Sequence, residues 1–135
     1  QDTEFAHSGH SSMRIDPMPG DRRRMLVGRT VGPRYLKPGH RYRFTAWIRR
    51  ETADVKGAVN LYHYTPHGNS SLMLEPTGDK AQSVKDWQKW EAFLDVPRDY
   101  EKMVIHMYNH SDASSFWIDD MRVEHVGLVK DDAAE

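Results

Sequence analysis

The short period of the hydrophobic pattern is the strongest constraint on the fold. In residues 41–50, apolar side chains recur at every second position, at Tyr42, Phe44, Ala46 and Ile48. This alternation is typical of a strand that buries one face, and no segment shows the period of about 3.6 residues of an amphipathic helix. Glycine, proline and asparagine separate the alternating segments, which is typical of tight turns. The pattern therefore predicts an all-β fold.

The alternating segments also predict the number and order of the strands. We expect eight strands, at residues 11–16, 24–31, 41–50, 57–64, 71–74, 90–96, 102–109 and 116–126. Strands of this length, joined by turns at regular spacing, predict an antiparallel β-sandwich or jelly roll. We assign residues 1–126 to one module and the charged, small-residue segment 127–135 to a tail or linker.

The composition argues against several classes of partner and site. The chain has 19 lysine and arginine residues against 20 aspartate and glutamate residues, so no net field attracts nucleic acid or an anionic membrane. No stretch approaches the ~20 apolar residues of a membrane span. The absence of cysteine excludes disulfides and thiolate zinc sites. The first residues lack the pattern of a signal peptide, so either a leader has been removed or the sequence is a segment of a longer chain, and we favour the second.

The second face of residues 41–50 carries a tryptophan among arginines. Arg43, Trp47 and Arg49 are out of phase with the apolar set and are expected to point away from the core. A protein binds a saccharide by stacking an aromatic ring on its C–H groups and surrounding that ring with hydrogen-bond donors. This combination favours a carbohydrate-binding surface, and the alternative is a tryptophan that packs under a loop.

Two further segments show the same outward pattern. In residues 57–64 and 102–109, the apolar positions define the core face and leave aromatic and polar residues on the other face. The alternative for each tyrosine is a half-buried position with its hydroxyl satisfied inside the sandwich. We expect the outward residues to extend the surface around Trp47, namely Asn60, Tyr62, Tyr64, His106 and Tyr108.

Four local patterns in order carry a resemblance to a known group of families. They are "AHSGHSSMRI", "YLKPGHRYRFTAWIR", "WQKWEAFLDVP" and "FWIDDMRVEHV". Together, over about residues 5–126, they resemble carbohydrate-binding modules of the family 4, 9, 16 and 22 type, which have a galactose-binding-domain-like β-sandwich. Such modules usually begin with a strand that carries an acidic residue before the "AHSG" turn. Here either that strand is missing or Glu4 takes its place.

The resemblance implies roles for the outward residues. By the match, Trp47 lies on a concave sheet and stacks on a glycan. Related xylan-binding modules carry an acidic residue two positions after the tyrosine of the penultimate strand, where this chain has His110 after Tyr108. The exchange disfavours a neutral xylan. Arg43, Arg49 and the triplet at residues 22–24 favour carboxylate or sulfate groups instead, although exposed arginines are usually only solvated.

The resemblance also implies a structural calcium ion between the first turn and the last strand. Asp119 would supply a carboxylate, because it is the first residue of the paired aspartates that such modules use. The carbonyl of His10 or Gly9 would supply a second oxygen, and Glu4 is a further candidate ligand. Alternatively, Asp119 and Asp120 form a polar bulge in the last strand.

The function implied by the resemblance is that of a non-catalytic carbohydrate-binding module. It would belong to a larger secreted enzyme that degrades polysaccharides, and would hold a covalently linked glycoside hydrolase or polysaccharide lyase domain near its polysaccharide or oligosaccharide ligand. Two alternatives remain. One is a protein-interaction sandwich of a surface assembly, with the same aromatics at the interface. The other is a small jelly-roll lyase that uses the His/Tyr/Asn/Arg set to abstract a proton.

Overall fold

Strands make up the regular structure of the described part of the chain. The computed structural model describes residues 9, 12–16, 27–32, 34–52, 55, 59–77, 85–107, 109 and 114–129. None of these residues forms a helix, so no helix able to cross a membrane occurs among them. The strands are β1 Met13–Ile15, β2 Val27–Val31, β3 His40–Arg50, β4 Val59–Thr65, β5 Gly68–Met73, β6 Glu75–Pro76, β7 Trp87–Asp95, β8 Lys102–Met107 and β9 Phe116–Leu128.

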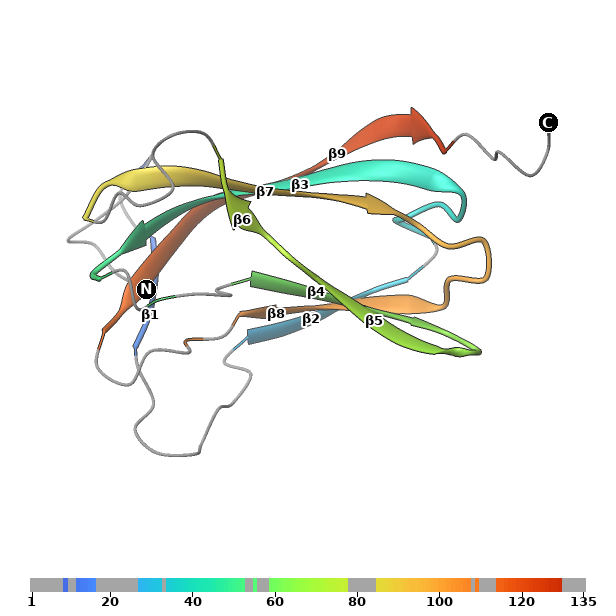
Figure 1. Ribbon diagram of the computed structural model, residues 1–135, viewed down its shortest axis with the longest axis horizontal. Coiled ribbons are helices and arrows are strands. Elements are labelled where there is room, and N and C mark those ends of the chain that lie inside the picture. The colour runs from blue at the N-terminus through green and yellow to red at the C-terminus, as the bar shows by residue number, and fades with distance from the viewer. Residues whose placement is uncertain are drawn as a thin grey trace.

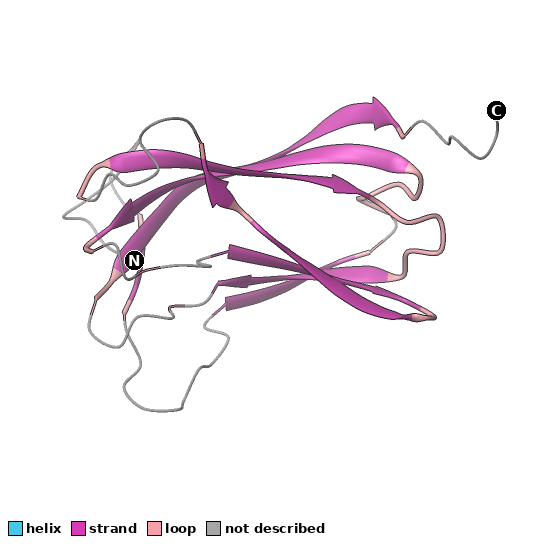
Figure 2. Ribbon diagram, viewed as in Figure 1, coloured by secondary structure: helices cyan, strands magenta, loops and turns pink. Residues whose placement is uncertain are grey.

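The strands form two antiparallel sheets that lie one over the other (Figure 1). One sheet has five strands in the order β1-β9-β3-β7-β6, and the other has four in the order β2-β8-β4-β5. Figure 2 shows the two layers of strands with loops at both ends. The predicted antiparallel β-sandwich is therefore confirmed.

The strand boundaries differ from the predicted ones at several ends, and three of these differences change the outline of the sheets. The two-residue strand β6 lies in a segment that was expected to be a turn. Strand β5 begins at Gly68, earlier than predicted, because the β4–β5 hairpin turns tightly and residues 65 and 68 already face each other. Strand β9 continues to Leu128, two residues beyond the expected end of the module.

The core lies between the sheets and follows the predicted alternation. On β3, Phe44, Ala46 and Ile48 are fully buried. They face residues of the other sheet that are buried to the same degree, including Leu61 on β4 and Met103 on β8. Burial of apolar surface is the main force that holds two such sheets together.

The turn that leads into β3 has a sequence-determined shape. The backbone N–H of His40 donates to the carbonyl of Lys37 at 3.2 Å, and Gly39 has φ +80°. Proline before a glycine with positive φ is the signature of a type II turn. The turn fixes where β3 begins, and therefore which of its side chains face the core.

Strand β9 contains a bulge at the paired aspartates. Thr45 pairs with Arg122 and Trp47 pairs with Asp119, so β9 has one more residue than β3 between these pairs. Asp120 takes a left-handed conformation with φ +50°, and its N–H donates to Oδ1 of Asp119 at 2.9 Å. Aspartate tolerates this conformation because its side chain bonds the local backbone.

One cation of β3 is buried at the end of the core. The guanidinium of Arg50 lies over the ring of Trp90 and donates to Oε1 of Gln88 at 3.2 Å and to the carbonyl of Val55 at 3.4 Å. Burial lowers the pKa of Arg50, since desolvation disfavours the charged form. These acceptors and the ring compensate for part of the lost hydration.

Candidate functional site

The two groups of outward aromatic residues lie on different sheets. Trp47 is on β3 of the five-stranded sheet, whereas Tyr62 and His106 are on β4 and β8 of the four-stranded sheet. Side chains that point away from the core leave the two sheets in opposite directions. The expectation that all these residues share one surface is therefore wrong. Alternation shows whether a side chain points inward or outward, but it does not show which sheet the strand joins.

The outer face of the four-stranded sheet brings together three predicted residues of β4 and one of β8. Residues that pair across antiparallel strands have neighbouring side chains on one face. The β4–β8 pairs on this face are Asn60 with His106, Tyr62 with Val104, and Tyr64 with Lys102. On the other side of β4, the same three residues pair with Met73, Ser71 and Asn69 of β5.

The aromatic side chains on this face form one continuous row, which we call the aromatic row: His106, Tyr62 and Tyr64. The rings of His106 and Tyr62 are stacked, with centroids 5.6 Å apart and planes 19° from parallel. The centroids of Tyr62 and Tyr64 are 5.8 Å apart. Lys102 extends the row, because its Nζ lies 5.2 Å from the centroid of Tyr64.

Polar groups surround the aromatic row. Asn69 and Ser71 on β5 are exposed beside the two tyrosines. Asn60 lies next to His106, and its Oδ1 is buried without a hydrogen-bond partner among the described residues. An unsatisfied buried acceptor costs free energy of about 1–3 kcal/mol. The face thus combines flat rings with donors and acceptors of the amide, hydroxyl and imidazole types.

Several charged and aromatic side chains on the outer face of the five-stranded sheet are held by contacts within the protein. Arg43 forms an ion pair with Glu91 at 2.6 Å, and Glu124 lies 4.0 Å from the same guanidinium. Thr45, next along the strand, is only 3% exposed. Arg43 does point outward as predicted, but two carboxylates already neutralise it.

Two tryptophans on the outer face of the five-stranded sheet are also partly or largely covered by neighbouring residues. Arg49 lies over the ring of Trp117 at 4.9 Å and donates to the carbonyl of Lys85 at 3.1 Å. Trp117 is 6% exposed although it lies on the outer face. Trp47 is half-buried and pairs with Lys89 and Asp119. A role for Trp47 or Arg49 in glycan binding remains a prediction, on a face separate from the aromatic row.

Several predicted residues lie outside the described part of the chain. These are Tyr108, His110, His10, Glu4 and the arginines at 22–24.

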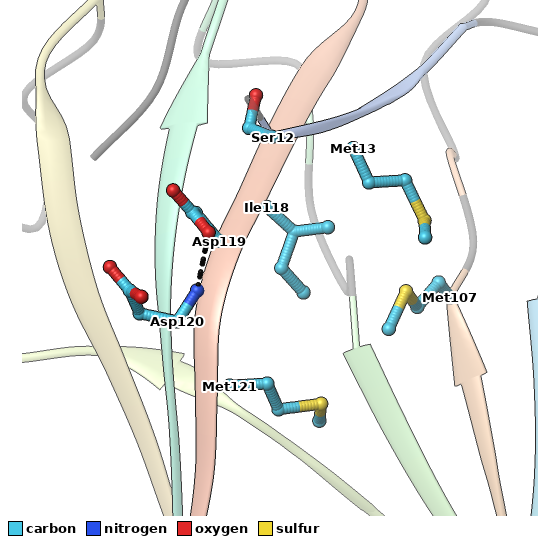
Figure 3. A pocket seen from close by; sticks show the side chains of 7 residues that line it. All are labelled: Ser12, Met13, Met107, Ile118, Asp119, Asp120 and Met121. Carbon is cyan, nitrogen blue, oxygen red and sulfur yellow. Dashed lines mark hydrogen bonds between the residues drawn. The ribbon is translucent and has the colours of Figure 1, made fainter. Parts of the chain in front are cut away.

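Asp119, the predicted calcium ligand, lies at the β9 bulge. Figure 3 shows its carboxylate and that of Asp120 on one side of β9, near Ser12 of the first strand region. Carboxylate and hydroxyl oxygens are of the type that calcium prefers. Gly9 has the positive φ of a turn residue, +65°, and the described residues contain no group of three acidic, histidine or cysteine side chains able to hold a metal. Calcium binding therefore remains a prediction that depends on further backbone ligands.

A pocket of about 380 Å³ lies at the same bulge. Four apolar side chains line it, together with the polar residues Ser12, Asp119 and Asp120, whose two carboxylates point away from the apolar ones (Figure 3): Met13, Met107, Ile118 and Met121. Methionine is flexible and fills irregular gaps between packed layers. Most of the lining is apolar and it carries no aromatic ring on which a sugar could stack, so the pocket is a poorer candidate for a glycan site than the aromatic row.

Lys102, Asn69 and Ser71 were not among the predicted site residues. The alternation in 102–109 does place Lys102 on the same face as His106, so the sequence contained that signal. Its position beside Tyr64 depends on the register of β4 and β8. Asn69 was missed because β5 begins earlier than the hydrophobic pattern suggests. Ser71 lies within the predicted strand, but its place beside Tyr62 depends on the register of β4 and β5.

Comparison with known proteins identifies the fold. The sequence matches no protein-family model and no curated protein. Among solved structures, it is similar to the C-terminal family 22 carbohydrate-binding module of Clostridium thermocellum Xyn10B, with 18% identity, a TM-score of 0.65, and coverage of 96% of this chain and 81% of that chain. A family 16 carbohydrate-binding module has 16% identity and a TM-score of 0.57, with coverage of 90% and 82%.

A third similar structure joins such a module to an enzyme. It contains the CBM22-1 and GH10 modules of a Clostridium thermocellum endo-1,4-β-D-xylanase complexed with xylohexaose. It has 14% identity and a TM-score of 0.65, and the match covers 96% of this chain and 24% of that one. The predicted resemblance is confirmed at the level of the fold: this chain has the β-sandwich fold of family 22 and family 16 carbohydrate-binding modules.

Proposed function

We propose that the protein is a non-catalytic carbohydrate-binding module that binds a glycan on the outer face of its four-stranded sheet. The observation that carries the proposal is the aromatic row, in which His106, Tyr62 and Tyr64 follow one another at 5.6 and 5.8 Å. Such a row offers adjacent flat surfaces to successive sugar units. Exposed amide and hydroxyl groups beside it supply the hydrogen bonds that orient a saccharide.

We prefer this face as the glycan site because its side chains are less engaged in contacts within the protein than those of the five-stranded sheet. On the five-stranded sheet, the best-placed cation is paired with carboxylates and one tryptophan is only 6% exposed. On the four-stranded sheet, the residues beside the tyrosines are exposed, including Asn69, Ser71 and Lys102. A ligand reaches these groups without first breaking an ion pair.

The similar structures support a module that works beside a catalytic domain. The fold is that of carbohydrate-binding modules, and in the xylanase such a module is joined to a GH10 module. We infer a similar arrangement here: a secreted parent enzyme in which this domain holds a covalently linked catalytic domain close to its polysaccharide. The domain itself would bind a polysaccharide or oligosaccharide and leave it chemically unchanged.

A panel of polysaccharides and oligosaccharides tests this proposal. We expect saturable binding to at least one glycan in calorimetry or affinity electrophoresis, with no new reducing ends and no unsaturated products after long incubation. Release of either product would show an enzyme, such as the jelly-roll lyase considered above. The absence of binding across a broad panel would contradict the proposal and favour a protein-interaction domain.

We also propose that a structural calcium ion binds near Asp119 and stabilises the module. A ligand that binds only the native state, and whose free concentration is about 100 times its Kd, adds ~2.7 kcal/mol to the free energy of unfolding. A chelator should then lower the Tm by roughly 10 °C for a domain of this size. Asp119→Ala should remove this sensitivity, whereas Asp95→Ala, which changes a surface carboxylate paired with Arg41, should retain it. Equal Tm values for the wild type with and without chelator would contradict the calcium proposal.

A further inference from the structure

We propose that the aromatic row selects an acidic saccharide, and that the carboxylate of a uronic acid unit binds at its Lys102 end. This inference rests on the proposed function and adds the class of ligand. The position of the ammonium group carries it: Nζ of Lys102 lies 5.2 Å from the centroid of Tyr64, the last ring of the row. A sugar stacked on Tyr64 would thus place its substituents next to a cation.

The four-stranded face contains no described side chain that would neutralise this cation. The described residues that pair across β4, β5 and β8 on this face are Asn60, Tyr62, Tyr64, Asn69, Ser71, Met73, Lys102, Val104 and His106, and none is acidic. None of the ion pairs between described residues includes Lys102. The face is therefore complementary in charge to an anion.

The two acidic residues nearest to Lys102 in sequence lie before the strand. Asp99 is 3.8 Å from Nε2 of His67, on the β4–β5 hairpin. Glu101 precedes β8, and its backbone N–H donates to the carbonyl of Tyr64 at 3.0 Å. The next residue on the strand, exposed Lys102, is thereby held opposite Tyr64, and its ammonium lies over the Tyr64 ring.

The two other predicted cations that lie in the described part of the chain are used within the protein. Arg43 is held by Glu91 and Glu124, and Arg49 lies over Trp117. A guanidinium already bound by carboxylates gains little from another anion. Lys102 differs because its described contact is with an aromatic ring that also forms part of the stacking surface.

The expected contribution is that of an exposed but well-placed ion pair. Charge-assisted hydrogen bonds are stronger than neutral ones, although water and salt screen them at a surface. Loss of the Lys102 charge should weaken binding of an acidic glycan by about three- to tenfold, or about 0.7–1.4 kcal/mol at 1.4 kcal/mol per decade. Binding of a neutral glycan with the same backbone should not change.

The test compares acidic polymers with their neutral derivatives. Glucuronoxylan and polygalacturonate would be titrated before and after chemical reduction of their carboxyl groups, against the wild type, Lys102→Gln and Lys102→Arg. We expect the wild type and Lys102→Arg to prefer an acidic polymer over its reduced form, and Lys102→Gln to bind both forms equally. Lys37→Gln is the matched control, because it removes the charge of an exposed lysine in the turn before β3. Salt at ~1 M, which shortens the screening length to about 3 Å, should reproduce the effect of Lys102→Gln.

The other outcomes separate this inference from the proposed function. Equal binding of acidic and reduced polymers by the wild type would overturn the choice of an acidic ligand and leave glycan binding intact. Loss of the acidic preference in Arg43→Gln but not in Lys102→Gln would place the anion on the opposite sheet and also overturn it. If the wild type binds none of these polymers or any other glycan of the panel, the proposed function fails, and this inference fails with it.

Discussion

Replacing Tyr62 with alanine is expected to weaken glycan binding by roughly ten- to a hundredfold. Tyr62 is the middle ring of the aromatic row, and it contacts both His106 and Tyr64. Stacking on an aromatic side chain is worth about 1–3 kcal/mol per ring in nucleic-acid binding, and we take this as the scale for a sugar ring. Each 1.4 kcal/mol corresponds to about a tenfold change in Kd. Calorimetric titration of wild type and variant with the best glycan of the panel measures the loss.

The matched control is Trp47→Ala, which removes an outward aromatic side chain from the other sheet. Both residues are half-buried and lie near the middle of long strands, so their removal should affect folding to a similar, modest extent. Under the proposed function, Trp47→Ala retains its affinity. The opposite result, with binding lost in Trp47→Ala and kept in Tyr62→Ala, would move the glycan to the five-stranded sheet, as the family resemblance of the sequence implies.

The fold was predictable from the sequence because the relevant information is local. Alternation in β3 identified its core face, and the Pro-Gly turn before it identified where the strand begins. The short strand β6 was missed because two residues are too few to show a period. The bulge at Asp119 and Asp120 was only one of two alternatives, since paired aspartates are equally compatible with a metal ligand.

The site was less predictable because it depends on pairing between distant segments. The sequence showed that Trp47, Tyr62 and His106 point outward, and the structure agrees for all three strands. Packing and loop connections decide which strands become neighbours, and the hydrophobic period of the sequence does not predict this strand order. Ion pairs between distant segments are equally hard to predict from the sequence. Arg43 looked available in the sequence, but Glu91 lies 48 residues away and reaches it only in the folded sheet.

The largest loss of stability is expected for Phe44→Ala. Phe44 is 0% exposed at the centre of β3, and truncation of a buried phenylalanine typically costs ~3–5 kcal/mol. Domains of this size have a total free energy of unfolding of only about 5–15 kcal/mol. The variant should therefore lose from about a fifth to most of its free energy of unfolding. Urea titration should show a midpoint that falls in the same proportion, with an unchanged slope.

Phe93→Ala provides the matched control from the neighbouring strand. Phe93 of β7 pairs with Arg43 of β3, and Phe44 of β3 pairs with Ala92, the residue before Phe93. The two phenylalanines therefore point to opposite faces of one sheet. Phe93 is 41% exposed and its described ring contact is with the guanidinium of Arg41 at 4.7 Å. An exposed cation–π contact is worth about 0.5–1 kcal/mol, so this variant should unfold at nearly the wild-type urea concentration. Equal destabilisation by the two substitutions would contradict the assignment of β3 and β7 faces, and with it the conclusion that Trp47 and Arg43 point away from the core.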